Sequence, residues 1–416
     1  MAQKPNGYSL PNGWRISPVG KSIPTEDMLL NLVPSPDGKI VVALHGGFNP
    51  HGLVVIDTKT ETVIQRIPLK SAWLGMAWQA DGKRLFVSGG NANGRNSSLA
   101  PIYVFGYTAG KLSGEPVSTF NETVDTSQVY WSGLAHHPKR NILYAANRGT
   151  SAAPGQVVIF DSATGKLQKR INVEVNPYDL VLSEDGTFLF VSNWGSDSIS
   201  IIDTASERVV GSVAVGDNPN DIELGDDGRL YVSCANDNSV IVVDTKSRQA
   251  VERISTALTP RSPEGSTPNG LALDRDTNIL FVANADNNSV AAISVANPGK
   301  SEILGFLPTG WYPSSLALTG KKPKLYIGNS KGMGGHANIR GPHSPLPPGD
   351  EGTGSVKSLQ KGSVTIVPLE NTKSEIKRWT KQVYENVPYR DEFLARAKTP
   401  TAPTVLPREV GAGSPI

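Results

Sequence analysis

The chain has 416 residues, of which 38% are apolar and 19% charged, and it contains 42 glycines and 31 prolines. Glycine and proline at this frequency argue against a bundle of long helices and favour many short strands joined by tight turns. The 40 basic residues nearly balance the 38 acidic ones, so the chain has no overall field that would attract nucleic acid or an anionic membrane. Its single cysteine, Cys234, excludes an internal disulfide and a multi-cysteine metal site.

The predicted strands begin with WRISPVG (14–20), and from residue 29 onward one unit recurs along the chain. Its three clearest copies are LFVSNWGSDSISIID (189–203), LYVSCANDNSVIVVD (230–244) and LFVANADNNSVAAIS (280–294). Weaker copies occur at 29–47, 75–90, 133–149 and 315–332. The clear copies lie about 40 to 50 residues apart, which is typical of four-stranded propeller blades.

Each clear copy follows a second shared phrase, which starts at Asn176, Asn218 or Thr267. This phrase predicts a proline-bearing entry loop, an inner strand and a tight turn, the first two turns being Asp-Gly. Two further strands and the outer strand follow in each unit. Seven such units predict an all-β fold, a seven-bladed β-propeller of four-stranded antiparallel blades.

Closing the ring requires the first and last blades to be hydrogen-bonded to each other. Residues 14–20 resemble an outer strand without a blade before it, so we expect them to pair with the last blade, which holds Tyr326 and Val364. Residues 375–383, EIKRWTKQV, are the alternative for that place. The propeller then spans 1–389, with a Gly/Pro-rich insertion at 332–361 in blade seven and a Pro-rich linker or tail at 390–416.

The repeated phrases resemble the YVTN-type, YncE-like β-propeller repeat over about residues 14–383. The C-terminal part, with GPHSPLPP in the insertion and RWTKQVYENVPY (378–389), is similar to the segment that leads into the hydrolase domain of bifunctional YncE-like and alkaline-phosphatase-like proteins. That resemblance implies a phosphoesterase domain as a partner after residue 416. It also implies a periplasmic or secreted protein, although the absence of a signal in this sequence leaves the cytoplasm open.

On a propeller, the loops that enter the inner strands and those that join the second and third strands share one face, the upper face, around the channel mouth. Aromatic side chains there can line a ligand pocket, or they can be wedges between blades. Cationic side chains there can bind a phosphate or carboxylate, or they can be solvated surface. The candidate ligand-binding residues are Trp73, Arg95, Trp131, Arg148, Tyr178, Trp194, Trp311, Lys331 and Arg340.

The histidines offer a weaker possibility. His45 and His51 follow the second strand of blade one, and His336 and His343 lie in the insertion of blade seven, which ring closure makes its neighbour. Four imidazoles could bind Zn²⁺ or Cu²⁺, but no two have a metal-motif spacing. We therefore expect no metal and no cofactor.

Three functions remain open. The first is a non-catalytic propeller that binds a small anionic ligand or a protein partner, or presents substrate to a following phosphoesterase domain. The second is a lactonase-like hydrolase, but among the entry loops Asp179 and Asp221 are acidic while Gly270 and Ser315 are not. The third is an extracellular interaction or surface module. The chain has no nucleophile elbow and no phosphate-binding glycine loop, so no motif supports catalysis by this chain alone.

Overall fold

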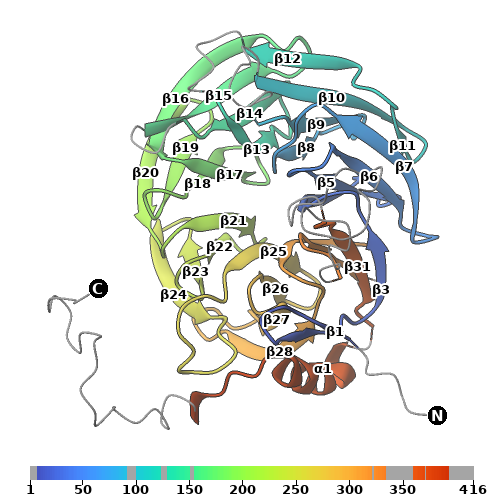
Figure 1. Cartoon of the computed structure of the whole chain (residues 1–416). Helices are drawn as coiled ribbons and strands as arrows, with labels where there is room; N and C mark the ends of the chain where they lie inside the picture. Colours follow the sequence, from blue (N-terminus) through green and yellow to red (C-terminus); the bar gives the residue numbers. More distant parts are fainter. Residues whose placement is uncertain are drawn as a thin grey trace, which may run out of the picture.

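The computed structural model describes residues 7–90, 100–122, 129–149, 154–320, 323–333, 359–370 and 372–392. Seven antiparallel sheets stand in a ring around a central opening (Figure 1), so the predicted seven-bladed all-β propeller is confirmed. Each blade runs from an inner to an outer strand in chain order, except where blades two and seven complete their outer edges differently. No helix among the described residues is long and apolar enough to cross a membrane.

The strands of the first three blades have the following bounds. Blade one comprises β4 (Leu29–Pro34), β5 (Ile40–His45), β6 (His51–Asp57) and β7 (Thr62–Leu69). Blade two comprises β8 (Met76–Trp78), β9 (Arg84–Ser88) and β10 (Ala100–Thr108), whose outer side pairs with both β11 (Lys111–Leu112) and β12 (Ser118–Glu122). Blade three comprises β13 (Trp131–His136), β14 (Ile142–Asn147), β15 (Pro154–Asp161) and β16 (Leu167–Val175).

The remaining blades contain the clear repeats. Blade four comprises β17 (Pro177–Leu182), β18 (Phe188–Asn193), β19 (Ser198–Asp203) and β20 (Arg208–Ala214). Blade five comprises β21 (Pro219–Leu224), β22 (Arg229–Cys234), β23 (Ser239–Asp244) and β24 (Gln249–Ser255). Blade six comprises β25 (Pro268–Asp274), β26 (Ile279–Asn284), β27 (Ser289–Ser294) and β28 (Glu302–Pro308). Blade seven comprises β29 (Pro313–Thr319), β30 (Lys324–Asn329), β31 (Ser363–Pro368) and β3 (Lys21–Pro24).

The repeated Val-Ser phrase has a structural role between blades. Ser88 Oγ donates a hydrogen bond to Trp131 O at 2.6 Å, from blade two to blade three. Ser192 and Ser233, at the equivalent positions, donate at 2.7 Å to Asn220 O and Asn269 O of the following blades. The apolar side chains that alternate with these serines pack in layers between adjacent blades. In blades two, four and five the recurrence of the phrase therefore reflects a bond to the next blade.

An N-terminal strand closes the ring, as predicted, but the strand is not residues 14–20. β3 pairs with β31 in antiparallel register, with Lys21 opposite Ile366 and Ile23 opposite Val364. Earlier in the chain, β2 (Arg15–Ile16) pairs instead with β1 (Tyr8–Ser9). Pro18 has no N–H to donate, and Gly20 turns the chain with φ +87°, so pairing with blade seven begins only at Lys21.

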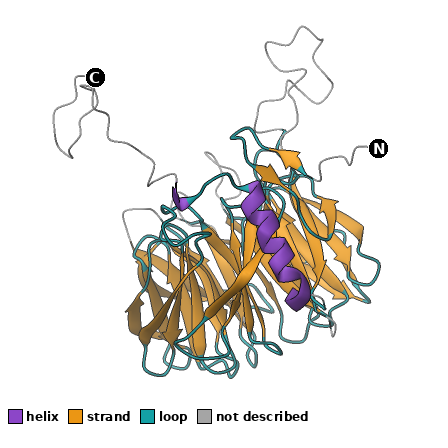
Figure 2. Cartoon of the chain, turned by 90° about the horizontal axis from the view of Figure 1, so that it is seen from below, coloured by secondary structure: helices purple, strands orange, loops and turns teal. Residues whose placement is uncertain are grey.

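The alternative closing strand, residues 375–383, is wrong: it lies within helix α1 (Thr372–Asn386). Its buried side chains Ile376, Trp379 and Val383 are spaced by three and four residues, which is the period of a helix and not of a strand. The helix lies against the outside of the strands (Figure 2), on the outer strand of blade six. Asn386 Nδ2 donates to Ser17 Oγ at 2.9 Å, so the two terminal segments contact each other.

Candidate functional site at the channel mouth

The inner strands leave a small cavity of about 40 Å³ in the channel, enough for a few water molecules. Its walls come from six of the seven blades, and most of the lining residues are at the beginning of an inner strand. The residues that line it are Leu30, Asn31, Leu74, Tyr178, Asp179, Asp221, Asn269, Ser314 and Ser315.

Two carboxylates from adjacent blades meet in this cavity. Asp179 on β17 and Asp221 on β21 are hydrogen-bonded to each other. Asp221 Oδ2 also accepts from Leu271 N of blade six at 2.6 Å, and Asp179 Oδ2 accepts from Ile222 N of blade five at 3.4 Å. Burial raises the pKa of both carboxyls, and the negative charge of Asp179 raises that of Asp221 further. The pair therefore resists carrying two negative charges.

The sequence contained part of the signal for this pair. Asp179 and Asp221 occupy the same place in the Asn-Pro-x-Asp phrase of two consecutive units, and consecutive blades are neighbours in the ring. A search for an acidic residue in every blade misses this arrangement, since two adjacent aspartates are enough to bring two carboxylates together.

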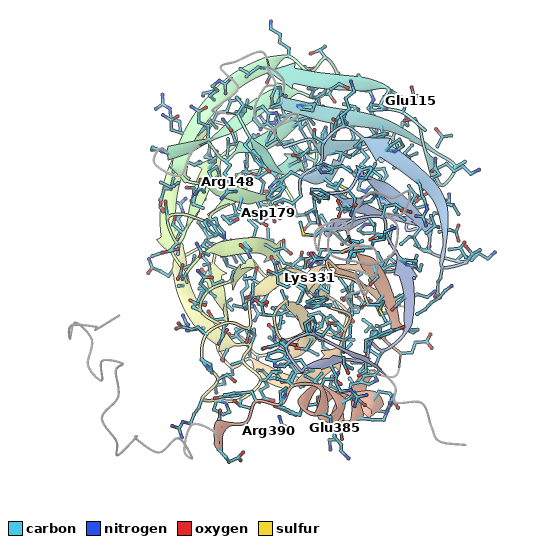
Figure 3. The ribbon with its side chains drawn as sticks, in the orientation of Figure 1. Glu115, Arg148, Asp179, Lys331, Glu385 and Arg390 are labelled. Carbon is cyan, nitrogen blue, oxygen red and sulfur yellow. The ribbon has the colours of Figure 1, made fainter. Side chains whose placement is uncertain are left out.

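Above the carboxylates, each of two cations lies over aromatic rings. The Arg148 guanidinium lies 5.5 Å from the centre of the Trp194 ring. Lys331 Nζ lies 4.2 Å from the ring centre of Tyr312 and 5.4 Å from that of Trp311. Arg148 and Lys331 make no ion pair with a carboxylate in the described part of the chain. Figure 3 shows both of them, with Asp179, around the central opening.

Backbone hydrogen bonds between the two kinds of upper-face loop hold these cations in place. Arg148 N donates to Tyr130 O at 2.9 Å, and Lys331 N donates to Trp311 O at 3.1 Å. Tyr312 has φ +62°, a left-handed conformation that is unfavourable for a bulky residue. Its N–H donates to Asn288 Oδ1 at 3.0 Å, so blade six helps to keep the ring beneath Lys331.

Tyr178 connects the two cation–aromatic pairs with the carboxylates. Burial raises the pKa of its hydroxyl strongly, and the negative charges of Asp179 and Asp221 add to this effect. Arg148 has the opposite effect, and Tyr312 is also within electrostatic range. The mouth is thus one continuous site, with cations and aromatic rings above and carboxylates below.

The other aromatic candidates have different surroundings. Trp131 is 1% exposed, its Nε1 donates to Ala100 O at 2.8 Å, and its ring packs edge-on against Phe160 in the core between blades. It is a wedge between blades and cannot reach a ligand. Trp73 is half-buried and packs edge-on against Tyr130, with 5.4 Å between ring centres. Arg95 and Arg340 lie outside the described residues.

The surroundings of His45 and His51, the two described histidines of the hypothetical metal site, give that site no support. Both ring nitrogens of His51 are bonded to backbone groups. Nδ1 accepts from Ala72 N at 2.8 Å, and Nε2 donates to Gly47 O at 3.2 Å. His45 is buried, and burial lowers its pKa to about 4. His336 and His343 lie outside the described residues. Within the described ranges no three His, Cys, Asp or Glu side chains form a group that could hold a metal.

A second, wider groove of about 950 Å³, open to solvent, lies at the turns of the opposite face. Phe188 and Phe190 contribute apolar surface to it. Arg275 crosses it to bind Glu223 at 2.9 Å and Asp226 at 2.8 Å. Burial raises the pKa of Glu223, whereas Arg275 lowers it. Five acidic residues line this groove against three basic ones, so it suits an anion less well than the channel mouth does.

A family model for the choice-of-anchor I domain matches residues 74–311, more than half of the chain. The chain belongs to the choice-of-anchor I domain family. The match covers all strands of blades two to six. No curated protein shows a significant match to this choice-of-anchor I chain.

Solved structures with a similar fold are also propellers or contain them. Hydrazine synthase of Kuenenia stuttgartiensis has a TM-score of 0.61 at 18% identity, with 74% of this chain and 93% of that chain covered. The RRP9 WD40 repeats have a TM-score of 0.62 at 15% identity, with 83% and 97% covered. U3-55K has a TM-score of 0.61 at 14% identity, with 84% and 98% covered. At such identities the likeness of these proteins to the choice-of-anchor I chain concerns the fold alone.

Proposed function

We propose that this choice-of-anchor I propeller is a non-catalytic binding protein whose channel mouth takes a small anionic ligand. The observation that carries the proposal is the placement of Arg148 on Trp194 and of Lys331 on Tyr312, both without a carboxylate partner among the described residues. The rings restrict both side chains and leave their N–H groups free to donate. A guanidinium can then bind a phosphate or carboxylate through two hydrogen bonds.

The same surface favours a ligand with a ring attached to its anionic group. Trp194, Trp311 and Tyr312 stand beside the two cations, and Tyr178 lies between them. Aromatic faces of this kind bind a sugar, a base or a phenyl ring by stacking. We therefore propose phosphorylated or carboxylated ring compounds as the ligand class.

Phenylphosphonate, which phosphatases do not hydrolyse, tests this function. Its binding is measured by calorimetry and by the fluorescence of the tryptophans at the mouth. We expect the double variant Arg148→Ala, Lys331→Ala to bind about tenfold more weakly or worse, because charged hydrogen bonds are lost.

The matched control is Arg248→Ala. Arg248 also lies over a ring, 5.8 Å from the centre of Phe188, but it follows the turn after β23 on the opposite face. Its removal is expected to leave binding unchanged within about twofold, a margin well under 1 kcal/mol. Absence of binding to the unaltered protein, or an equal loss in the control, would contradict the proposal.

We also propose that the bound ligand is presented to a phosphoesterase-type domain in a longer protein. One observation favours this: the chain beyond α1 runs to the upper face. Asp391 accepts hydrogen bonds from Thr259 Oγ1 at 2.6 Å and Arg261 N at 3.2 Å, in the entry loop of blade six. The last described residues of the chain therefore lie on the same side as the channel mouth.

In a longer protein, this second proposal predicts that phenylphosphonate at the mouth alters phosphoesterase turnover. Arg148→Ala is expected to reduce that response and Arg248→Ala to leave it unchanged. Equal responses in the two variants would contradict presentation of the ligand, even if binding itself depends on Arg148. The predicted insertion at 332–361 would contribute to such docking, but residues 334–358 lie outside the described residues.

A further inference from the structure

The two aspartates below the mouth each accept a backbone hydrogen bond from the following blade. Oδ2 of Asp221 accepts from Leu271 N, and Oδ2 of Asp179 accepts from Ile222 N. Leu180 N also donates to the carboxyl of Asp179, and the two carboxyls are hydrogen-bonded to each other beside the cavity that both line. The inter-blade bonds thus hold both carboxyls beside the same small space.

A third oxygen at this cavity has no partner. Ser315, from blade seven, is 5% exposed and lines the cavity, and its Oγ makes no hydrogen bond within the described part of the chain. A buried hydroxyl without a partner is unfavourable. Asn269 Oδ1 is a fourth oxygen at the cavity, and it accepts from Asn220 Nδ2 at 3.0 Å. An oxygen acceptor of this kind has capacity for a second contact.

No described cation neutralises the two carboxylates. Arg275 is bound to Glu223 and Asp226, and Arg148 is stacked on Trp194. The other titratable groups in electrostatic range, Tyr178 and Glu223, add no positive charge. Two adjacent carboxylates in a buried site need either a shared proton or a cation between them.

We propose that Asp179 and Asp221 bind one divalent cation in the central channel, with Ser315 and Asn269 as neutral oxygen ligands. Carboxylate, amide and hydroxyl oxygens form a hard set, and Ca²⁺ is the cation that such a flexible set fits best, because Mg²⁺ requires near-octahedral geometry. A cavity of about 40 Å³ accommodates the ion and a water molecule. This site is independent of the anion-binding function proposed for Arg148 and Lys331.

Calorimetric titration of the full chain, stripped with EDTA and dialysed at pH 7.5, with CaCl₂ tests the site. We expect one equivalent to bind, and the Tm to rise by about 3 °C or more at a calcium concentration about a hundredfold above Kd. Asp221→Asn and Asp179→Asn should each lower the affinity about tenfold or more, and Ser315→Ala should lower it measurably. An asparagine Oδ1 can still accept from Leu271 N or Ile222 N, so these variants preserve the inter-blade bonds.

Asp226→Asn is the control, because Asp226 is an acidic residue of the opposite face whose side chain is 73% exposed. Its calcium binding should equal that of the unaltered protein. The proposal is overturned if CaCl₂ and MgCl₂ at 10 mM, a concentration of about the weakest known protein calcium sites, cause neither heat nor a rise in Tm. It is also overturned if Asp226→Asn loses as much affinity as Asp221→Asn. If neither CaCl₂ nor MgCl₂ has an effect, the two carboxyls share a proton instead of a cation. The Tm of the unaltered protein would then be highest below neutral pH.

Discussion

His45 stands at the end of β5 in the wall of blade one, where it is 4% exposed. Its Nδ1 has no hydrogen-bond partner among the described residues. Burial is the main reason that its pKa falls to about 4, and Glu26 opposes the shift only in part. The imidazole is therefore neutral at physiological pH, and it acts as a core side chain whose protonation the fold resists.

This burial predicts a specific acid sensitivity. Above pH 6.5 His45 is neutral in both folded and unfolded chains, so it makes no pH-dependent contribution. As the pH falls from 6.5 toward 4, the unfolded chain binds a proton that the folded chain does not, and the free energy of unfolding falls by up to about 3 kcal/mol. Urea unfolding at pH 7.5 and pH 4.5 should show a smaller loss in His45→Gln than in the unaltered protein.

The other histidines do not change the expected difference between His45→Gln and the unaltered protein. Burial also lowers the pKa values of His136 and His137, but they are present in both proteins and contribute equally to both losses. Identical pH dependence in the two proteins would show that His45 titrates normally in the folded state.

At the scale of elements, helix α1 packs closely against strand β28 because that strand has a glycine at the contact. Gly305 of β28 faces Thr380 and Ile376, and a Cβ atom there would collide with both. Its φ of +151° is also unfavourable for other residues. Next to it, Phe306 N donates to Thr380 Oγ1 at 2.9 Å. The glycine thus allows the helix to cover the outer edge of blade six, which would otherwise expose unpaired backbone groups.

Gly305→Val is expected to detach α1 and to lower the free energy of unfolding by about 3 kcal/mol or more, since both the contact and the backbone conformation are lost. Gly211→Val is the matched control. Gly211 is in the equivalent register of β20 in blade four, but a Cβ there would meet Arg248 Cδ only at 3.4 Å. The control should change stability by less than about 1 kcal/mol.

Urea unfolding measures the free energy of unfolding of the two variants. Limited trypsin digestion measures how fast the backbone is cut after Arg378 and Lys381, which the helical conformation of α1 slows. The expected result is rapid cleavage in the Gly305 variant alone. Equal stability and equal cleavage in the two variants would show that the helix does not depend on this close approach.

At the scale of the whole molecule, the repeat made the fold predictable, because its strands alternate in the same way in each unit and its Val-Ser pair bonds to the next blade in blades two, four and five. The ends of the chain were less predictable. Pro18 and Gly20 shift the closing strand to 21–24, and the three-to-four spacing around Trp379 makes a helix where a strand was an alternative. The loops carrying Arg148 and Lys331 could be assigned to the upper face from topology alone.

The site was predictable only in part, since side-chain direction decides it. Trp131 begins the inner strand β13 and Trp194 follows β18, but the first is buried in the core between blades and the second lies beneath Arg148. The Asp179–Asp221 pair depends on two neighbouring blades presenting the same repeat position to one cavity. Composition and spacing do not distinguish the two tryptophans, and the repeated Asn-Pro-x-Asp phrase indicates the aspartate pair only in part.

The molecule as a whole is predicted to have no phosphatase or lactonase turnover by itself. His136 Nε2 and Ser162 Oγ are 3.0 Å apart, but Ser162 is fully buried and cannot reach a substrate. Among the described residues no three His, Cys, Asp or Glu side chains form a group of the kind that hydrolases use to hold a metal. Assays with p-nitrophenyl phosphate and simple lactones, with Ca²⁺, Mg²⁺, Mn²⁺ or Zn²⁺ added, should give background rates. Turnover that disappears on Asp179→Asn would show instead that the channel is catalytic.

The most direct test of the central claim is a crystal structure of the protein with phenylphosphonate at a concentration about tenfold above its measured Kd, at which about nine-tenths of the sites are filled. The account predicts that the phosphonate lies at the channel mouth, with its oxygens within hydrogen-bonding distance of Arg148 or Lys331 and its ring against Trp194, Trp311 or Tyr312. A phosphonate found only in the groove beside Phe188 and Arg275, or an empty mouth at that concentration, would contradict it.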